Sequence, residues 1–160
     1  MKKLYIGLLR ISIGSVFLWA FFDKLLGLGY ATESSKSWLS GASPTLGYLK
    51  FGTEGPFSEV FQGLAGNPIV DWLFMIGLLG IGIAFVFGIS LKFASYSGAI
   101  MMILIYLSAF PPENHPIIDD HIIYALVLLI LAELKAGEQM GFSKQWSKSK
   151  IAKILPFLRN

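Results

Sequence analysis

The sequence predicts an all-α fold: an integral membrane, four-helix antiparallel bundle that forms a single membrane domain over residues 1–160. Composition is the first observation behind this prediction. The chain is 54% hydrophobic and only 14% charged, which is too apolar for an ordinary soluble domain. The second observation is that four segments come close to the roughly 20 apolar residues that a transmembrane helix needs. These segments cover residues 4–26, 69–89, 93–110 and 117–134.

The first segment follows Lys2 and Lys3, as the apolar core of a signal peptide would. Its apolar run is longer than the usual core of roughly 7–15 residues, and Arg10 interrupts it, so we expect a retained helix. Arg10 would lie at about the same depth as Glu133 in the fourth segment. We therefore expect Arg10 and Glu133 to form a structural ion pair that fixes the register of the two helices.

Residues 27–68 form a long loop between the first two segments, and loops of this length are usually functional or flexible. Apolar residues recur at helical spacing after Pro56, and Trp38 and Tyr48 lie on either side of a Ser-Pro step. This pattern predicts that the long outer loop forms short interfacial helices. They would either cap the mouth of the bundle or lie on the lipid surface, and the sequence favours neither arrangement.

The second segment carries a stripe of small residues, Gly77, Gly80, Ala84 and Gly88. Small residues let helix backbones approach closely in lipid, so we expect this stripe to face another helix. The turn at residues 89–92 is short enough to make the second and third segments an antiparallel hairpin.

The basic residues predict the orientation of the bundle. If the four segments alternate in direction, both termini share one side with the 89–92 turn, and most lysines fall there. The opposite side carries most of the acidic residues, so we expect a cell-membrane protein with both termini in the cytoplasm. Residues 143–160 would form a cationic, amphipathic cytoplasmic tail on anionic lipid. The basic residues form no groove, so we expect no nucleic-acid partner.

A dense polar cluster, residues 114–121, stands at the mouth of the fourth segment. Ionisable groups are costly near hydrocarbon, which makes the cluster a candidate functional site. One interpretation is structural, because Asp119 and Asp120 would stabilise the positive end of a helix that starts near Pro116. A second interpretation is a metal site, since histidine and aspartate are ligands for zinc and non-haem iron.

Helix geometry argues against a metal or haem at this cluster. Adjacent helical residues diverge by about 100°, so Asp119, Asp120 and His121 cannot all face one ion. His115 and His121, both near one helix end, cannot ligate the two faces of one haem, and only ligation by a single histidine stays open. We expect neither group.

A third interpretation is a quinone or small-substrate site at the outer membrane interface. Asp120 and His121 would be the catalytic pair that exchanges protons, because histidine titrates in the useful range and carboxylates tune it. Lys24 would hold an anionic substrate across the bundle from them. The other residues that we expect to contact the substrate are Asp23, Asp119, Trp72 and Tyr124.

Several of these residues belong to a family pattern. Residues 9–14 (LRISIG), 17–20 (FLWA) and 23–25 (DKL) resemble the first helix of the DoxX family. Residues 114–116 (NHP) and 119–121 (DDH) are similar to the family's pattern before its fourth helix. The DoxD-like branch, which is related to the membrane subunit of thiosulfate:quinone oxidoreductase, looks closest. The positions that match the pattern are Arg10, Gly14, Lys24, Asp119, Asp120 and His121.

The resemblance implies a small four-helix membrane protein and, for some relatives, an oxidoreductase that passes electrons from a sulfur compound to quinone with a second subunit. The chain has no cysteine, so covalent sulfur chemistry would belong to that partner. We expect a membrane subunit of a quinone-linked oxidoreductase system. Alternatives are a non-catalytic anchor or assembly module for a soluble oxidoreductase and, less favoured, a small-solute carrier. Catalysis by this chain and homo-oligomer formation stay open.

Overall fold

The computed structural model describes residues 1–159, so Asn160, at the end of the predicted tail, lies outside the described residues. The fold is all-α, with 71% of the chain in helices and no strand among the described residues. The predicted fold class is confirmed at this level.

Within residues 1–159, three helices are long and apolar enough to cross a membrane. They are α1 (Lys2–Leu26), α4 (Pro68–Phe87) and α5 (Leu91–Ser108), and they match the first three predicted segments. The local sequence favours the start of α4 in particular. Asn67 caps α4 by accepting a hydrogen bond from the Ile69 backbone, and Pro68 occupies the first turn, where no N–H is needed.

The fourth predicted segment forms a shorter helix than expected. Helix α6 (Asp120–Glu133) has 14 residues, about 21 Å of helix at 1.5 Å per residue. The hydrocarbon core of a bilayer is roughly 30 Å thick. Residues 117–119, which the sequence assigned to this helix, belong to the preceding loop. A fourth membrane-spanning helix therefore remains a prediction.

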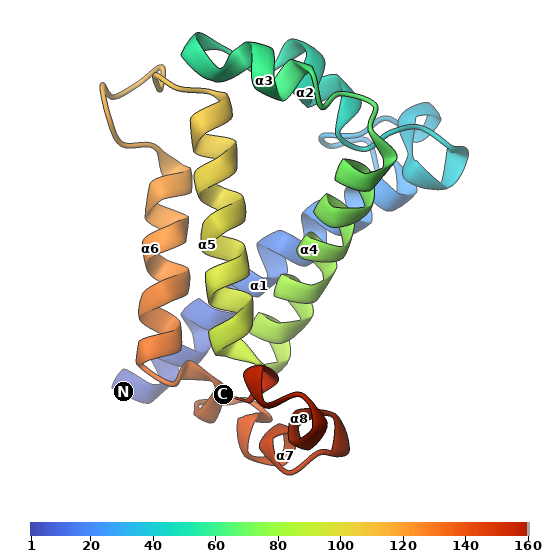
Figure 1. Cartoon of the computed structure of the whole chain (residues 1–160). Helices are drawn as coiled ribbons and strands as arrows, with labels where there is room; N and C mark the ends of the chain where they lie inside the picture. The colour runs from blue at the N-terminus through green and yellow to red at the C-terminus, as the bar shows by residue number, and fades with distance from the viewer. Residues whose placement is uncertain (160) are drawn as a thin grey trace.

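The four long helices alternate in direction (Figure 1). Helix α1 packs along α4, α5 packs along α6, and the predicted hairpin joins α4 to α5. The hairpin turns at Gly88, whose φ of 70° is a left-handed conformation that glycine adopts without strain. The α1–α4 and α5–α6 pairs converge where α1 begins, which we call the tail end, and diverge at the opposite cap end (Figure 1).

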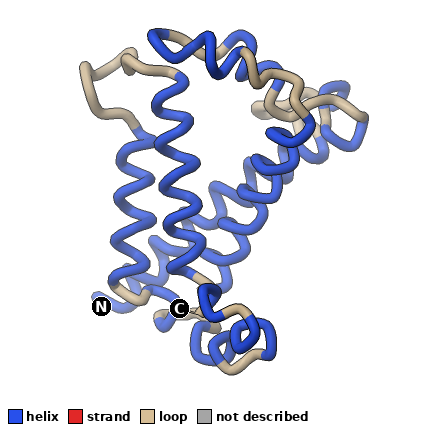
Figure 2. The backbone as a smooth tube through the Cα atoms, in the orientation of Figure 1, coloured by secondary structure: helices blue, strands red, loops and turns tan. Residues whose placement is uncertain are grey.

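The loop between α1 and α4 forms five short helices separated by turns (Figure 2), which confirms that this loop carries short helices. We call it the cap, because its second half crosses from the start of α4 to the end of α5 (Figure 1). The five helices are η1 (Ser34–Lys36), η2 (Trp38–Ser40), α2 (Leu46–Phe51), η3 (Gly55–Phe57) and α3 (Ser58–Gln62).

Hydrogen bonds fasten the cap to two of the long helices. The hydroxyls of Ser43 and Thr45 donate to the buried carboxylate of Asp71 at the start of α4, at 2.8 and 2.5 Å. The Tyr48 hydroxyl lies 2.7 Å from the Ser108 hydroxyl at the end of α5. These contacts tie the cap to both α4 and α5.

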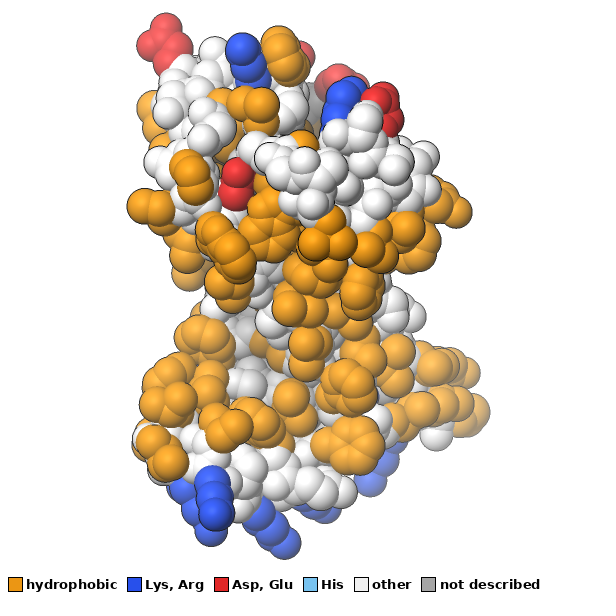
Figure 3. Space-filling model, turned by 90° about the vertical axis from the view of Figure 1, so that its right-hand side faces the viewer, with side chains coloured by type: hydrophobic (Ala, Val, Ile, Leu, Met, Phe, Trp, Pro, Cys, Tyr) orange, Lys and Arg blue, Asp and Glu red, His pale blue; other side chains and the backbone are white. Residues whose placement is uncertain are grey.

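The tail lies at the opposite end of the molecule. It contains η4 (Ala136–Glu138), α7 (Ser143–Ser147), α8 (Lys150–Ile154) and η5 (Pro156–Leu158). Figure 3 shows a belt of hydrophobic side chains around the middle of one face, with lysines and arginines at the tail end. Carboxylates, mixed with a few lysines, gather at the cap end (Figure 3).

Arg10 is the largest fully buried side chain, at 0% exposure. One of its terminal nitrogens donates to the carbonyl oxygens of Phe85 and Val86 in the last turn of α4. The other donates to the carbonyl oxygens of Gln139 and Met140, at 3.2 and 3.0 Å. Arg10 therefore joins α1 to the end of α4 and to the first part of the tail.

The predicted ion pair between Arg10 and Glu133 is not formed within residues 1–159. Glu133 is exposed at the end of α6. The last carbonyls of a helix have no partners inside the helix, and they carry the negative end of its dipole. The last carbonyls of α4 lie against α1, where they accept hydrogen bonds from the buried guanidinium of Arg10. The carboxylate of Glu133 is exposed to solvent instead and does not reach it.

Two glycines set the close approach of α1 and α4. A Cβ atom on Gly14 would lie 2.7 Å from the Val86 backbone nitrogen, and one on Gly82 would lie 2.9 Å from the Leu18 backbone nitrogen. The predicted small-residue stripe is wrong at Gly80, where an added Cβ would meet nothing within 4 Å. The contact face of α4 therefore runs through Gly82.

Candidate functional site

Asp119 starts α6. Its backbone is extended, and one carboxylate oxygen accepts hydrogen bonds from the backbone nitrogens of His121 and Ile122, at 3.0 and 3.1 Å. Aspartate is among the best residues at this position, because its side chain satisfies backbone donors that the helix leaves free. The structural interpretation of the polar cluster is therefore correct for Asp119.

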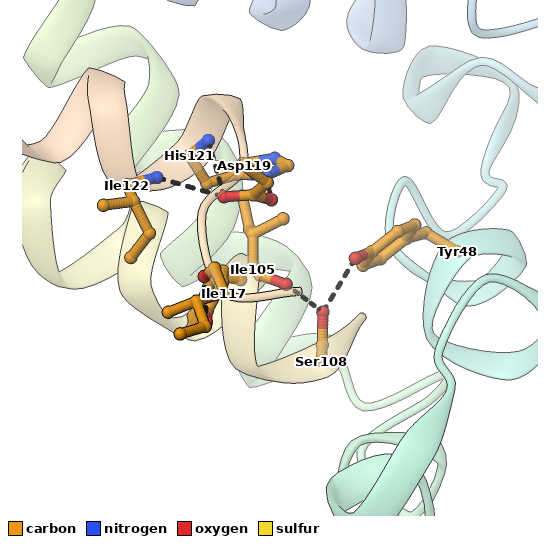
Figure 4. Close-up of polar contacts among 8 residues, drawn as sticks. Tyr48, Ile105, Ser108, Ile117, Asp119, His121 and Ile122 are labelled. Carbon is orange, nitrogen blue, oxygen red and sulfur yellow. Dashed lines mark hydrogen bonds and ion pairs between the residues drawn. The ribbon is translucent and has the colours of Figure 1, made fainter. Parts of the chain in front are cut away.

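The second carboxylate oxygen of Asp119 lies 2.6 Å from Nδ1 of His121 (Figure 4). The His121 and Asp119 side chains are 34% and 22% exposed. A carboxylate bound at one ring nitrogen orients the imidazole and leaves the other nitrogen, Nε2, to exchange a proton with a substrate. We call this pair the Asp119–His121 dyad.

The sequence paired His121 with Asp120, and the structure pairs it with Asp119 instead. Successive side chains on a helix point about 100° apart around its axis, so Asp120 points away from His121. The Asp120 side chain is exposed. Asp119 lies outside the helix, where its extended backbone turns the carboxylate back over the first turn. The role of orienting His121 therefore belongs to Asp119.

Hydrogen bonding keeps Asp119 ionised. Partial burial acts to raise the pKa of Asp119, but the hydrogen bonds from the His121 side chain and the Ile122 backbone outweigh it, so the pKa lies below its usual value. The pKa is lower in the folded chain than in the unfolded chain. Ionised Asp119 therefore stabilises the fold above about pH 4, and this contribution is lost as the pH falls through the folded pKa.

We expect Asp119→Ala to lower the free energy of unfolding in detergent by about 1 kcal/mol at pH 7, the usual cost of losing a helix cap. The cost should shrink at a second, acidic pH below the folded pKa of Asp119, where the wild-type carboxylate takes up a proton. Thermal unfolding followed by circular dichroism at the two pH values measures it. Asp120→Ala is the matched control and should cost less at pH 7, and an equal cost for both variants would contradict the assignment.

The loop before the dyad is organised by His115 and Tyr106. Nδ1 of His115 accepts hydrogen bonds from the Ile117 and Ile118 backbones, at 3.1 and 2.9 Å. The Tyr106 hydroxyl donates to the Ile117 carbonyl at 2.5 Å. The side chain of His115 thus holds the loop by binding the backbone of the residues that follow it. In the described part of the chain, no three His, Asp or Glu side chains group as metal ligands would.

The remaining predicted site residues lie elsewhere. Asp23 is buried and accepts hydrogen bonds from the Tyr30 and Ala31 backbones, at 3.3 and 3.1 Å, so it holds the turn after α1. Lys24 follows it in the last turn of α1. The Trp72 ring packs against Trp38 of the cap, with ring centroids 4.6 Å apart.

The structure therefore divides the predicted site into two groups. Asp119, Asp120 and His121 lie at the start of α6, with Tyr124 one turn further and 37% exposed. The group from α1 and α4 lies with the cap, on the side of the molecule away from α6 (Figure 1). The two groups do not meet across the bundle, so Lys24 does not face His121.

Sequence reasoning missed Ser108. Its side chain is 1% exposed, and its hydroxyl donates to the Ile105 carbonyl at 2.7 Å while contacting the Tyr48 hydroxyl (Figure 4). Its carbonyl also accepts a hydrogen bond from the Glu54 backbone at 2.9 Å. A serine at the end of an apolar helix was the available signal. Ser108 therefore fastens the cap to the end of α5.

Comparison with known proteins assigns no family to this chain. No family model, no curated protein and no solved structure matches it. The resemblance to the DoxX family remains a prediction from the residues quoted above. Function is therefore inferred from the chemistry of the Asp119–His121 dyad and its surroundings.

Proposed function

We propose that the chain is an integral protein of the cell membrane, with α1, α4, α5 and α6 as its four membrane helices. Three apolar helices, basic side chains at the tail end and carboxylates at the cap end support this arrangement. By the charge rule, the tail end and both termini are cytoplasmic and the cap lies outside. The short α6 is accommodated by local thinning of the bilayer.

In this orientation the dyad lies at the outer membrane interface. Helix α6 begins further toward the tail end than α5 finishes (Figure 1), so the first turn of α6 lies below the level of the cap. A substrate that diffuses within the bilayer can approach the dyad from the lipid side. Quinones are such substrates, since their isoprenoid chains keep them in the membrane.

We infer that the chain is the membrane subunit of a quinone-linked oxidoreductase system. The observation that carries this proposal is the 2.6 Å contact between Asp119 and His121 at a membrane interface. Reduction of a quinone to a quinol takes two electrons and two protons. His121 donates one of these protons to the nearer quinone oxygen and regains a proton from water, and water supplies the second proton, while Asp119 keeps the ring oriented.

The electrons come from a second subunit that oxidises a reduced sulfur compound, as the resemblance to the DoxX family implies. Without cysteine, this chain contributes no thiol to that oxidation. In this proposal the chain itself binds quinone and transfers protons to it, and the second subunit supplies the electrons.

The test is binding of a short-chain ubiquinone to the purified full chain in detergent, followed by quenching of tryptophan fluorescence. We expect one saturable site, and His121→Ala should weaken binding about tenfold, the effect of one lost hydrogen bond of roughly 1.4 kcal/mol. Asp119→Ala should also weaken binding, because it releases the imidazole. The matched control Asp120→Ala should stay within twofold of wild type.

Absence of saturable binding would contradict the proposal, as would an equal loss in Asp120→Ala. The non-catalytic anchor is the alternative that such a result supports, because an anchor has no need of a quinone site.

A further inference from the structure

A cavity of about 970 Å³ lies between the tail and the tail-end portions of α5 and α6. Helix η5 forms one wall by packing against the first part of α5 (Figure 1). The other walls come from the last turn of α6, the segment after it, and α7. Its volume is at the upper end of the range for small-molecule sites. The dyad lies at the opposite end of α6, so this is a separate place in the molecule.

The lining of the cavity is strongly cationic. Among the described residues, no ion pair joins a lining cation to a lining carboxylate. The excess of positive charge therefore remains available to an anionic ligand. The cations are Lys92, Lys135, Lys144, Lys148 and Arg159, and the carboxylates are Glu133 and Glu138.

Arg159 is held in position at the rim. Its Nε donates to the Ala152 carbonyl at 3.0 Å, which fixes one edge of the guanidinium. A planar guanidinium binds phosphate oxygens in pairs and suits phosphate recognition better than a flexible ammonium group. Lys144 and Lys148, one turn apart on and just after α7, line the same cavity.

The other side of the cavity is apolar and continuous with the face of α5 that would contact lipid. The rings of Phe93 and Phe157 pack edge to face, with centroids 5.5 Å apart. Phe93 and Tyr96, on consecutive turns of α5, are 48% and 49% exposed. Since α5 is long and apolar enough to cross a membrane, its exposed rings at this level lie where acyl chains begin.

We propose that this cavity is a binding site for an anionic phospholipid from the leaflet at the tail end. The phosphate lies among Lys144, Lys148 and Arg159, and the acyl chains leave along Phe93 and Tyr96. Basic pockets beside membrane helices select anionic headgroups in this way. A free phosphate shares the charge but has no use for the aromatic wall, which is why the geometry favours a lipid.

The test is native mass spectrometry of the delipidated full chain in detergent, titrated with phosphatidylglycerol or phosphatidylcholine. We expect one phosphatidylglycerol to bind at least tenfold more tightly than phosphatidylcholine. The double variant Lys144→Gln/Lys148→Gln should weaken phosphatidylglycerol binding about 25-fold, because each lysine near an anionic lipid contributes roughly fivefold. Both lysines are exposed, so folding should be unaffected, and circular dichroism checks this.

The matched control is Lys150→Gln/Lys153→Gln, which removes the same charge from exposed tail residues outside the cavity. It should stay within threefold of wild type. Equal losses in the two double variants would overturn the proposal in favour of general surface attraction. Binding of sn-glycerol 3-phosphate as tight as that of phosphatidylglycerol would overturn the lipid assignment in favour of a soluble phosphate.

Discussion

Replacing Arg10 with methionine should lower the free energy of unfolding by about 4 kcal/mol, because it leaves buried carbonyls without a donor. The guanidinium serves four carbonyl oxygens, from Phe85, Val86, Gln139 and Met140. Methionine fills the space without replacing these bonds. Thermal unfolding in detergent measures the loss, and faster trypsin cleavage in the tail would report release of its first segment.

Two further variants separate this account from an ion pair. Glu133→Gln should change the free energy of unfolding by less than about 0.5 kcal/mol, as exposed substitutions usually do. Arg10→Lys should fall between wild type and Arg10→Met, because an ammonium group cannot reach all four carbonyls at once. A cost for Glu133→Gln close to that of Arg10→Met would contradict the structure.

Substitution of Gly82 by valine should lower the free energy of unfolding by about 3 kcal/mol, a typical cost of overpacking a close contact. An added Cβ would lie 2.6 Å from Cγ and 2.9 Å from the backbone nitrogen of Leu18. The side chain can move, but the backbone of α1 cannot retreat without separating from α4. Thermal unfolding in detergent again measures the loss.

Gly80→Val is the matched control on the same helix, because an added Cβ at Gly80 meets nothing within 4 Å. Both substitutions change helix propensity by the same amount, so the difference between them isolates the contact with α1. We expect Gly80→Val to stay within about 0.5 kcal/mol of wild type. Equal effects at the two positions would contradict the packing of α1 against α4.

The sequence could predict the helices because length and apolar composition determine them locally. It could not locate the start of α6. The run from Ile117 onward is apolar enough for a helix, but Asp119 offers a capping side chain that begins the helix at Asp120. Capping depends on the backbone conformation of one residue, which composition does not record.

Contacts between residues far apart in the sequence were harder to predict than the positions of the helices. A search among side chains for a partner of Arg10 finds Glu133, because backbone carbonyls are the same at every residue and give no signal. Which glycine faces a neighbour depends on how a helix is rotated, and Gly80 and Gly82 differ by about 200° around the axis. The prediction that Asp23 and Lys24 face His121 across the bundle was wrong because it also depended on positions in space. The backbone of Tyr30 and Ala31 holds the Asp23 carboxylate in the turn after α1.

The most direct test of the central claim is to extract the purified full chain and measure its bound quinone by chromatography. We predict close to one quinone per chain in wild type and in Asp120→Asn, and little in His121→Ala. A wild-type protein without quinone, or a His121→Ala protein that retains it, would contradict a proton-exchanging quinone site at the Asp119–His121 dyad.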